Sequence, residues 1–256
     1  MARLDGKVAL ITGATGGIGE ATARAYLREG ANVMLVGRSE DKLTETRERL
    51  GHADATATFA TDAADDAGVR DSVAATVAAF GGLDILFANA GTEGQVKPLT
   101  ELTTDNFDQV LRTNVIGPWL TIKHAAGELT ERGGGSVIVT SSIAGAIGFP
   151  GLSAYVASKH AVNGLVKTAA LELAPARIRV NAIAPGMIDN RMLHSIAGQI
   201  DTDNPDAVLE GVMPSVPLQR LGRSEEIAEL AVFLGSDESS YCTGSVHLMD
   251  GGYVAA

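Results

Sequence analysis

Cysteine is almost absent from this 256-residue chain. Cys242 is the only one, so no disulfide can form within the chain, and no metal-ligand partner is spaced around it. The five histidines show no ligand-like grouping with acidic residues either. We therefore predict no metal site, and we expect a reducing compartment, the cytoplasm.

Basic charge is also in short supply. The chain has 20 Lys and Arg residues against 31 Asp and Glu residues, which gives a formal net charge of -11 at pH 7. Such a surface repels phosphate groups, and the basic residues form no stripe along the sequence. Nucleic acid and an anionic membrane surface are therefore not expected as partners.

Signals for secretion or membrane insertion are missing as well. Residues 1–7 alternate in charge and run into an apolar segment, unlike the regions of a signal peptide. Residues 133–158 carry no charged side chain, but Gly-Phe-Pro-Gly at 148–151 and several hydroxyls interrupt them. We expect a buried strand, a loop and a helix start there.

Aromatic residues make up only 4% of the chain, whereas hydrophobic residues make up 45%. This balance suits the close packing of parallel strands and helices better than an aromatic-rich sandwich. Short apolar runs predict strands at 8–12, 32–36, 56–61, 83–88, 136–140, 179–184 and 245–249. Helical patterns lie between them at 18–29, 40–50, 66–80, 104–130, 152–174 and 224–235. This alternation predicts an α/β fold, a single Rossmann-type doubly wound domain over 1–256, with a seven-stranded parallel sheet and helices on both faces.

One long segment, about 187–222, has no strong periodicity and is rich in proline and glycine. It also contains apolar residues such as Met192 and Met213. We predict an irregular, mobile lid over a ligand.

A glycine-rich turn follows the first predicted strand, with the sequence Thr12-Gly13-Ala14-Thr15-Gly16-Gly17-Ile18-Gly19. Glycines let the backbone approach a pyrophosphate, and the free amides of the next helix attract it. The alternative is a tight turn that binds nothing. No Gly-Lys-Ser/Thr sequence follows, which disfavours a P-loop nucleotidase.

The second strand ends at Gly37-Arg38-Ser39, without a carboxylate to bind a ribose hydroxyl. Arg38 can form paired hydrogen bonds with a 2′-phosphate, or it can pair with Glu40 or Asp41 at the surface. NADP(H) is therefore favoured over NAD(H), which stays possible.

Three residues near the fifth strand suggest acid/base chemistry. Tyr155 and Lys159 share one face of a helix, and Ser142 precedes them after the strand. A phenol must lose about 3 pKa units, or about 4 kcal/mol, to act as a base at neutral pH. An ammonium about 4 Å away contributes roughly that much. Tyr155 could then exchange a proton with a carbonyl or alcohol oxygen that Ser142 also binds. A surface helix pair and a turn serine are the plainer alternative.

These motifs occur together and in order: Thr12-Gly13-x-x-x-Gly17-x-Gly19, Asn89-Ala90-Gly91, Asn114, Ser142, Tyr155-x-x-x-Lys159 and Pro185-Gly186. With them the chain resembles the short-chain dehydrogenase/reductase family, and the resemblance extends to Asp250-Gly251-Gly252. Two positions depart from the common pattern: Ala88 replaces the first Asn of Asn-Asn-Ala-Gly, and Asn190 stands where a Thr often contacts the nicotinamide amide.

The resemblance implies a catalytic set of Asn114, Ser142, Tyr155 and Lys159, with Asn114 holding a water in a proton relay at a helix opened before Gly117-Pro118. It also implies that Asp62 lies near the adenine, that Asn89 supports the sheet and cofactor, and that Lys159 holds the nicotinamide ribose. The implied cofactor contacts are Gly13, Thr15, Gly17, Ile18, Gly19, Arg38, Asp62, Ala63, Asn89, Ala90, Gly91, Tyr155, Lys159, Pro185, Gly186 and Ile188. A homotetramer is implied too, with interfaces on helices 104–130 and 152–174 and on the C-terminal segment.

The expected activity is NAD(P)(H)-dependent interconversion of a secondary alcohol and a ketone. The alternatives are a 3-oxoacyl-[acyl-carrier-protein] reductase, disfavoured because both proteins would be acidic, and a nucleotide-sensing protein without chemistry, disfavoured by the complete Ser-Tyr-Lys set. An apolar substrate pocket is proposed from Phe149, Met187, Met192, Leu193 and Met213, although ordinary lid packing explains them equally well.

Overall fold

The structure, a computed structural model, describes residues 2–255. Seven parallel strands form one sheet in the order β3-β2-β1-β4-β5-β6-β7. The strands are β1 (Val8–Thr12), β2 (Asn32–Gly37), β3 (Thr56–Ala60), β4 (Ile85–Ala88), β5 (Gly135–Thr140), β6 (Ile178–Pro185) and β7 (Val246–Met249). The strand order reverses between β1 and β4, and ligands of doubly wound sheets bind at such a switch point. The predicted α/β class and seven-stranded parallel sheet are confirmed.

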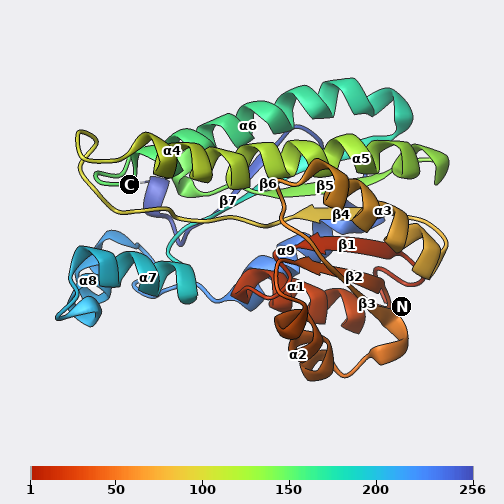
Figure 1. The fold of residues 1–256 in the computed structure, drawn as a ribbon, viewed down its shortest axis with the longest axis horizontal. Helices are drawn as coiled ribbons and strands as arrows, with labels where there is room; N and C mark the ends of the chain where they lie inside the picture. The colour runs from red at the N-terminus through yellow and green to blue at the C-terminus, as the bar shows by residue number, and fades with distance from the viewer. Residues whose placement is uncertain (1, 256) are drawn as a thin grey trace.

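Helices cover both faces of this sheet (Figure 1). One layer consists of α1 (Gly17–Arg28), α2 (Glu40–Leu50) and α9 (Ser224–Gly235). The other layer consists of α3 (Asp66–Phe80), α4 (Thr104–Leu111), α5 (Gly117–Glu131) and α6 (Ser153–Leu173).

Each central strand contributes to two separate cores. In β1, Ile11 packs with α1 and α9, whereas its neighbour Leu10 packs in the core with α5 and α6. All five β1 residues are buried, which explains its continuous apolar sequence. Small side chains such as Ala23 and Ala231 allow α1 and α9 to approach closely, and the buried Tyr26 hydroxyl donates a hydrogen bond to the Ala231 carbonyl at 3.1 Å.

The long helix expected over 104–130 is interrupted. A π-helical turn at Arg112–Ile116 separates α4 from α5. Pro118 is at the second position of α5 and lacks the backbone amide that would continue the regular hydrogen-bond pattern. The loosened turn expected before Gly117-Pro118 is therefore present.

The prediction that segment 187–222 is irregular was wrong. It contains α7 (Arg191–Ile200) and α8 (Pro205–Val212), which lie at one end of the sheet, away from the two helical layers (Figure 1). The Asn190 side chain caps α7 by accepting from the amides of Met192 at 2.9 Å and Leu193 at 3.2 Å. Pro205 opens α8 because the first helical position needs no amide donor. Along residues 2–255, every helix is too short or too polar to traverse a bilayer.

Candidate active site

The glycine-rich turn joins β1 to α1 at the carboxyl edge of the sheet. Gly13 has φ +65°, and a Cβ there would lie 2.8 Å from the Ala90 Cα. A Cβ on Gly19 would overlap the Gly13 carbonyl oxygen, which keeps the turn and helix in close contact. Gly16 and Gly17 are exposed, and Gly16 offers no side chain to cap the first amides of α1. These amides are free to bind an anion, as a pyrophosphate requires.

Asn89 connects three strands beside this turn. Its Nδ2 donates to the carbonyls of Thr12 and Gly13, both at 3.3 Å, and its Oδ1 accepts from Thr140 Oγ1 at 3.0 Å. The Thr12 hydroxyl accepts from the amides of Asn89 at 3.0 Å and Ala90 at 3.1 Å. The ends of β1, β4 and β5 are therefore held at fixed positions beside the glycine-rich turn.

Arg38 follows β2 and is exposed. Among residues 2–255, its side chain forms no ion pair with Glu40, Asp41 or another acid. The surface pairing considered for Arg38 is therefore not formed. Asp62 follows β3, is also exposed, and accepts a hydrogen bond from the Ala64 amide at 2.8 Å.

Ser142, Tyr155 and Lys159 lie together beyond the end of β5. Ser142 starts a short 3-10 turn and accepts from the Ala144 amide at 3.1 Å, while Tyr155 and Lys159 lie one turn apart in α6. Lys159 is buried, with its Nζ 5.5 Å from the centre of the Tyr155 ring and 2.8 Å from the Thr140 carbonyl to which it donates. The three side chains are close enough to act on one small molecule.

Burial controls the ionisation of both helix residues. It raises the pKa of Tyr155 to about 12, and hydrogen bonding with Ser142 lowers this pKa only in part, while the charge of Glu93 raises it. Burial also lowers the pKa of Lys159 to about 8. In the protein without a bound cofactor, Lys159 therefore does not lower the pKa of Tyr155 below its ordinary value, as had been expected. At neutral pH Tyr155 is protonated, and most Lys159 side chains are charged.

Asn114 occupies the centre of the π-helical turn and is buried. Its Oδ1 accepts from the Thr92 amide at 2.8 Å, and its Nδ2 donates to the Thr92 carbonyl at 2.9 Å and to Ser158 Oγ at 3.0 Å. A Cβ on Gly91 would lie 3.5 Å from Asn114 Oδ1 and 3.8 Å from Lys159 Nζ. The π turn thus brings Asn114 beside the loop after β4 and close to the reacting centre.

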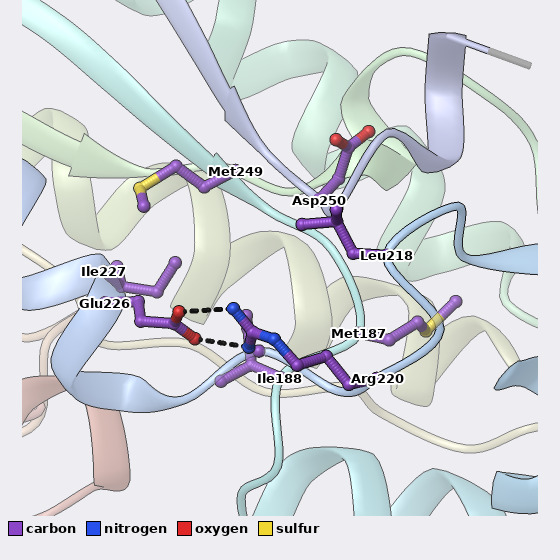
Figure 2. Close-up of a pocket in the computed structure, with 10 residues that line it drawn as sticks. Met187, Ile188, Leu218, Arg220, Glu226, Ile227, Met249 and Asp250 are labelled. Atoms are coloured by element: carbon purple, nitrogen blue, oxygen red, sulfur yellow. Dashed lines mark hydrogen bonds and ion pairs between the residues drawn. The ribbon is translucent and has the colours of Figure 1, made fainter.

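Residues 185–188 run from the end of β6 into the predicted lid. A cavity of about 140 Å³ lies beside them, and Ile188, Met187 and Leu218 are among its lining residues. Arg220 and Glu226, which also line it, form an ion pair at 2.7 Å (Figure 2). Gly186 packs so closely on the next segment that a Cβ would lie 2.6 Å from the Asp250 Cα. The predicted cofactor residue Ile188 forms one wall of this cavity.

A separate apolar cluster adjoins Tyr155. Its buried members are Ala144, Leu152 and Tyr155, and the half-buried side chains packed on them are Val96, Phe149, Val156 and Met192. The Phe149 ring lies 6.2 Å from the ring of Tyr253. Of the five proposed pocket residues, Phe149 and Met192 are in this cluster, and Met187 lines the cavity of Figure 2 instead. Within 2–255, Leu193 and Met213 belong to neither.

Sequence reasoning missed Val96, Tyr253 and Glu93. Val96 lies in a segment without a recognisable motif, and Tyr253 follows Asp250-Gly251-Gly252, which gave no sign of a contact with Phe149. Glu93 is a buried acid two residues after Asn89-Ala90-Gly91. The one signal in the sequence was the polar residues Arg191, Ser195 and Gln199, which recur every four residues and so would form one polar side of a helix that could bind Glu93.

Comparisons with known proteins agree with this arrangement. A family profile described as enoyl-(acyl carrier protein) reductase matches residues 13–254. The oxidoreductase UcpA of Salmonella typhimurium is 41% identical over 255 residues, covering 98% of this chain and 96% of that protein. The chain belongs to the short-chain dehydrogenase/reductase family.

Other relatives carry more specific names. Levodione reductase of Leifsonia aquatica is 38% identical over 258 residues, covering 99% of this chain and 96% of the relative. A crystal structure of levodione reductase superposes with a TM-score of 0.96 at 36% identity, covering 99% of this chain and all of the other. Short chain aldehyde dehydrogenase 1 of Euphorbia lathyris is 37% identical, covering 98% of this chain and 89% of that protein. The chain is therefore an oxidoreductase that acts on a small molecule with NAD(P)(H), as short-chain dehydrogenases/reductases do.

Proposed function

We propose that this enzyme interconverts a secondary alcohol and a ketone, with Tyr155 as the general acid/base. The observation that carries the proposal is the position of Ser142, Tyr155 and Lys159 next to an apolar cluster that includes Phe149 and Met192. An apolar wall suits a carbonyl compound without charged groups. The levodione reductase relative, named for a ketone, supports the same substrate class.

The residues present fit a dinucleotide cofactor. The free amides in the first turn of α1, beginning with exposed Gly17, suit its pyrophosphate, and the unpaired Arg38 suits a 2′-phosphate, so we propose NADP(H) as the preferred form. The other proposed contacts are Gly13, Thr15, Ile18, Gly19, Asp62, Ala63, Asn89, Ala90, Gly91, Pro185, Gly186 and Ile188. When bound, the nicotinamide ring supplies a hydride to a ketone or accepts one from an alcohol.

The side chains of the protein carry out the proton transfer. In reduction, Tyr155 donates its phenolic proton to the carbonyl oxygen while Ser142 hydrogen-bonds the same atom, and the ketone gains one hydride and one proton. Lys159, buried and close to the ring, stabilises the resulting phenolate and holds the ribose. Asn114 is proposed to hold a water that returns a proton towards Lys159. In oxidation the same steps run in reverse.

Replacing Tyr155 with Phe tests this proposal. The substitution removes the proton donor but keeps the ring, so kcat should fall by about 1,000-fold or more while the dissociation constant of the cofactor changes little. Turnover of a ketone panel with NADPH and fluorescence titration of the cofactor would measure the two effects. A Tyr155→Phe enzyme with nearly normal kcat would rule out the mechanism.

Reduction of a carrier-linked substrate is the second candidate function, because the description of the matching family profile names an acyl carrier protein. A net charge of -11 opposes docking of an acidic carrier. Kinetics with a free 3-oxoacyl thioester and with its carrier-bound form separate the two. A kcat/KM that is higher on the carrier would favour this second function.

The remaining architecture is proposed on the same basis. We propose that residues 1–256 act as one NAD(P)-binding domain, that segment 187–222 closes over substrate, and that the enzyme is a cytoplasmic homotetramer. Large apolar side chains exposed on α5 and α6, such as Trp119 and Leu171, support the interface positions.

A further inference from the structure

An ion pair between a buried acid and an exposed base joins the loop after β4 to the first turn of α7. The Glu93 side chain is only 7% exposed, and its two oxygens lie 3.2 and 3.3 Å from the Nη1 and Nη2 atoms of Arg191. The Arg191 side chain is 71% exposed, so the acid is enclosed and the base covers it from outside. Ser195, one turn further along α7, lies near the same carboxylate and helps to lower its pKa.

The same face of α7 makes a second connection to this loop. Gln199 Oε1 accepts from the Val96 amide at 2.9 Å, and its Nε2 donates to the Gly94 carbonyl at 3.3 Å. Arg191, Ser195 and Gln199 are each four residues apart and therefore share one side of the helix. α7 is attached to the 93–96 loop along most of its length.

Both partners of this connection also contact the reacting centre. Thr92, next to Glu93, is held on both its backbone groups by Asn114. Val96 from the loop and Met192 from α7 pack in the apolar cluster with Tyr155. The distance between loop and helix therefore determines how Val96 and Met192 pack beside Tyr155.

The energetics favour a closed arrangement. Burial raises the pKa of Glu93, but the influence of Ser195 and Arg191 outweighs it and leaves this pKa below its ordinary value. Glu93 is therefore ionised at neutral pH. Moving α7 away would break two charge-assisted hydrogen bonds between Arg191 and the ionised Glu93 carboxylate.

We propose that Glu93 is a positioning residue, whose pairing with Arg191 clamps α7 onto the 93–96 loop and fixes the substrate pocket over Tyr155. The inference rests on the proposed function and assigns one part of the same site. Arg191 from α7 and Tyr155 from α6 are the ionisable groups that face Glu93, and Lys159 is the further charge beside Tyr155.

Glu93→Gln tests the clamp with little change of shape. KM for levodione, used as the probe ketone, should rise about tenfold with kcat changed much less, because positioning is lost before chemistry. The negative charge that raises the Tyr155 pKa is also removed, so the pH profile of kcat/KM for alcohol oxidation should move to lower pH. A residue that only stabilised the fold would not move this profile.

Three companion variants separate the contributions. Arg191→Gln breaks the clamp but keeps the carboxylate, so KM should rise without the downward pH shift. Gln199→Ala removes only the second connection and should raise KM less, with no pH shift. Asp71→Asn removes an ion pair with Arg70 within α3 and should leave the pH profile unchanged.

Hydrogen exchange provides a readout that needs no turnover. The amides of α7 should exchange faster in Glu93→Gln and Arg191→Gln than in the unaltered protein, because the clamp no longer restrains the helix. Unchanged exchange in α7, or unchanged KM and pH profile in an active enzyme, overturns the clamp. Faster exchange in a chain that reduces no ketone would retain the clamp and reject the proposed function.

Discussion

Arg38 is the residue on which the proposed preference for NADP(H) depends. Its guanidinium is exposed at the end of β2, and no neighbouring acid in residues 2–255 competes for it. Paired hydrogen bonds to a phosphate are stronger than neutral ones and are available only to the 2′-phosphorylated cofactor. One side chain can therefore discriminate between the two cofactors.

Arg38→Ala should weaken NADPH binding by about 10- to 100-fold, since a charge-assisted hydrogen bond contributes about 1.5–3 kcal/mol. NADH binding should change little. Isothermal titration with both cofactors measures the difference, and Arg70→Ala, at an exposed arginine on α3, is the matched control. An unaltered NADP(H) to NAD(H) ratio would contradict the role given to Arg38.

Single residues also show where sequence reasoning stops. Tyr155 and Lys159 could be predicted because their spacing within one helix fixes their mutual position. Glu93 could not, because its partner Arg191 lies 98 residues away and only the fold brings them together. The burial that raises the pKa of Tyr155 in the protein without cofactor could not be predicted either, because it depends on the packing around α6.

At the scale of elements, the contact between the glycine turn and α1 is the tightest requirement. No side chain fits at position 19, because a Cβ there overlaps the Gly13 carbonyl oxygen. The backbone must shift to accept one, which displaces the amides proposed to bind the pyrophosphate.

Gly19→Ala should therefore lower the affinity for NADPH by at least about tenfold and lower the thermal midpoint as well. Gly127→Ala is the matched control, because Gly127 is exposed within α5 and a Cβ there meets nothing within 4 Å. That substitution should stabilise the protein by about 0.5–1 kcal/mol through helix propensity. Cofactor binding that survives Gly19→Ala unchanged would remove the turn from the proposed site.

Strands and helices with strong periodicity could be predicted closely, while special turns could be predicted only in part. The break near Asn114 was expected from Pro118, but its π-helical form depends on hydrogen bonds to Thr92 and Ser158 from distant segments. α7 and α8 were missed because Pro205 and Asn190 resemble loop residues, although each starts a helix here.

On the scale of the whole molecule, the exposed apolar side chains are the features that bear on how copies of the chain assemble. Trp119 is 46% exposed and Leu171 is 80% exposed, on the two long helices where interfaces are proposed. Burying them between copies of the chain would release about 25 cal/mol per Å² of apolar area.

Light scattering at several concentrations should give a mass close to four times 26.4 kDa. Trp119→Glu should shift the population to smaller species, because a charge is costly at the centre of an apolar interface. Exposed Tyr241 lies outside both helices, and Tyr241→Glu should leave the mass unchanged. A monomeric wild-type protein would exclude the tetramer.

The division of each central strand between two cores limits how the chain length can vary. Leu10 and Ile11 belong to opposite cores, so inserting or deleting one residue within β1 would exchange every inward-facing group between them. Such an indel would place large side chains where small ones fit on both sides of the sheet at once. Insertions and deletions among natural homologues should therefore occur in the connections between elements, because a change of length there does not alter which face of the sheet a strand residue points to.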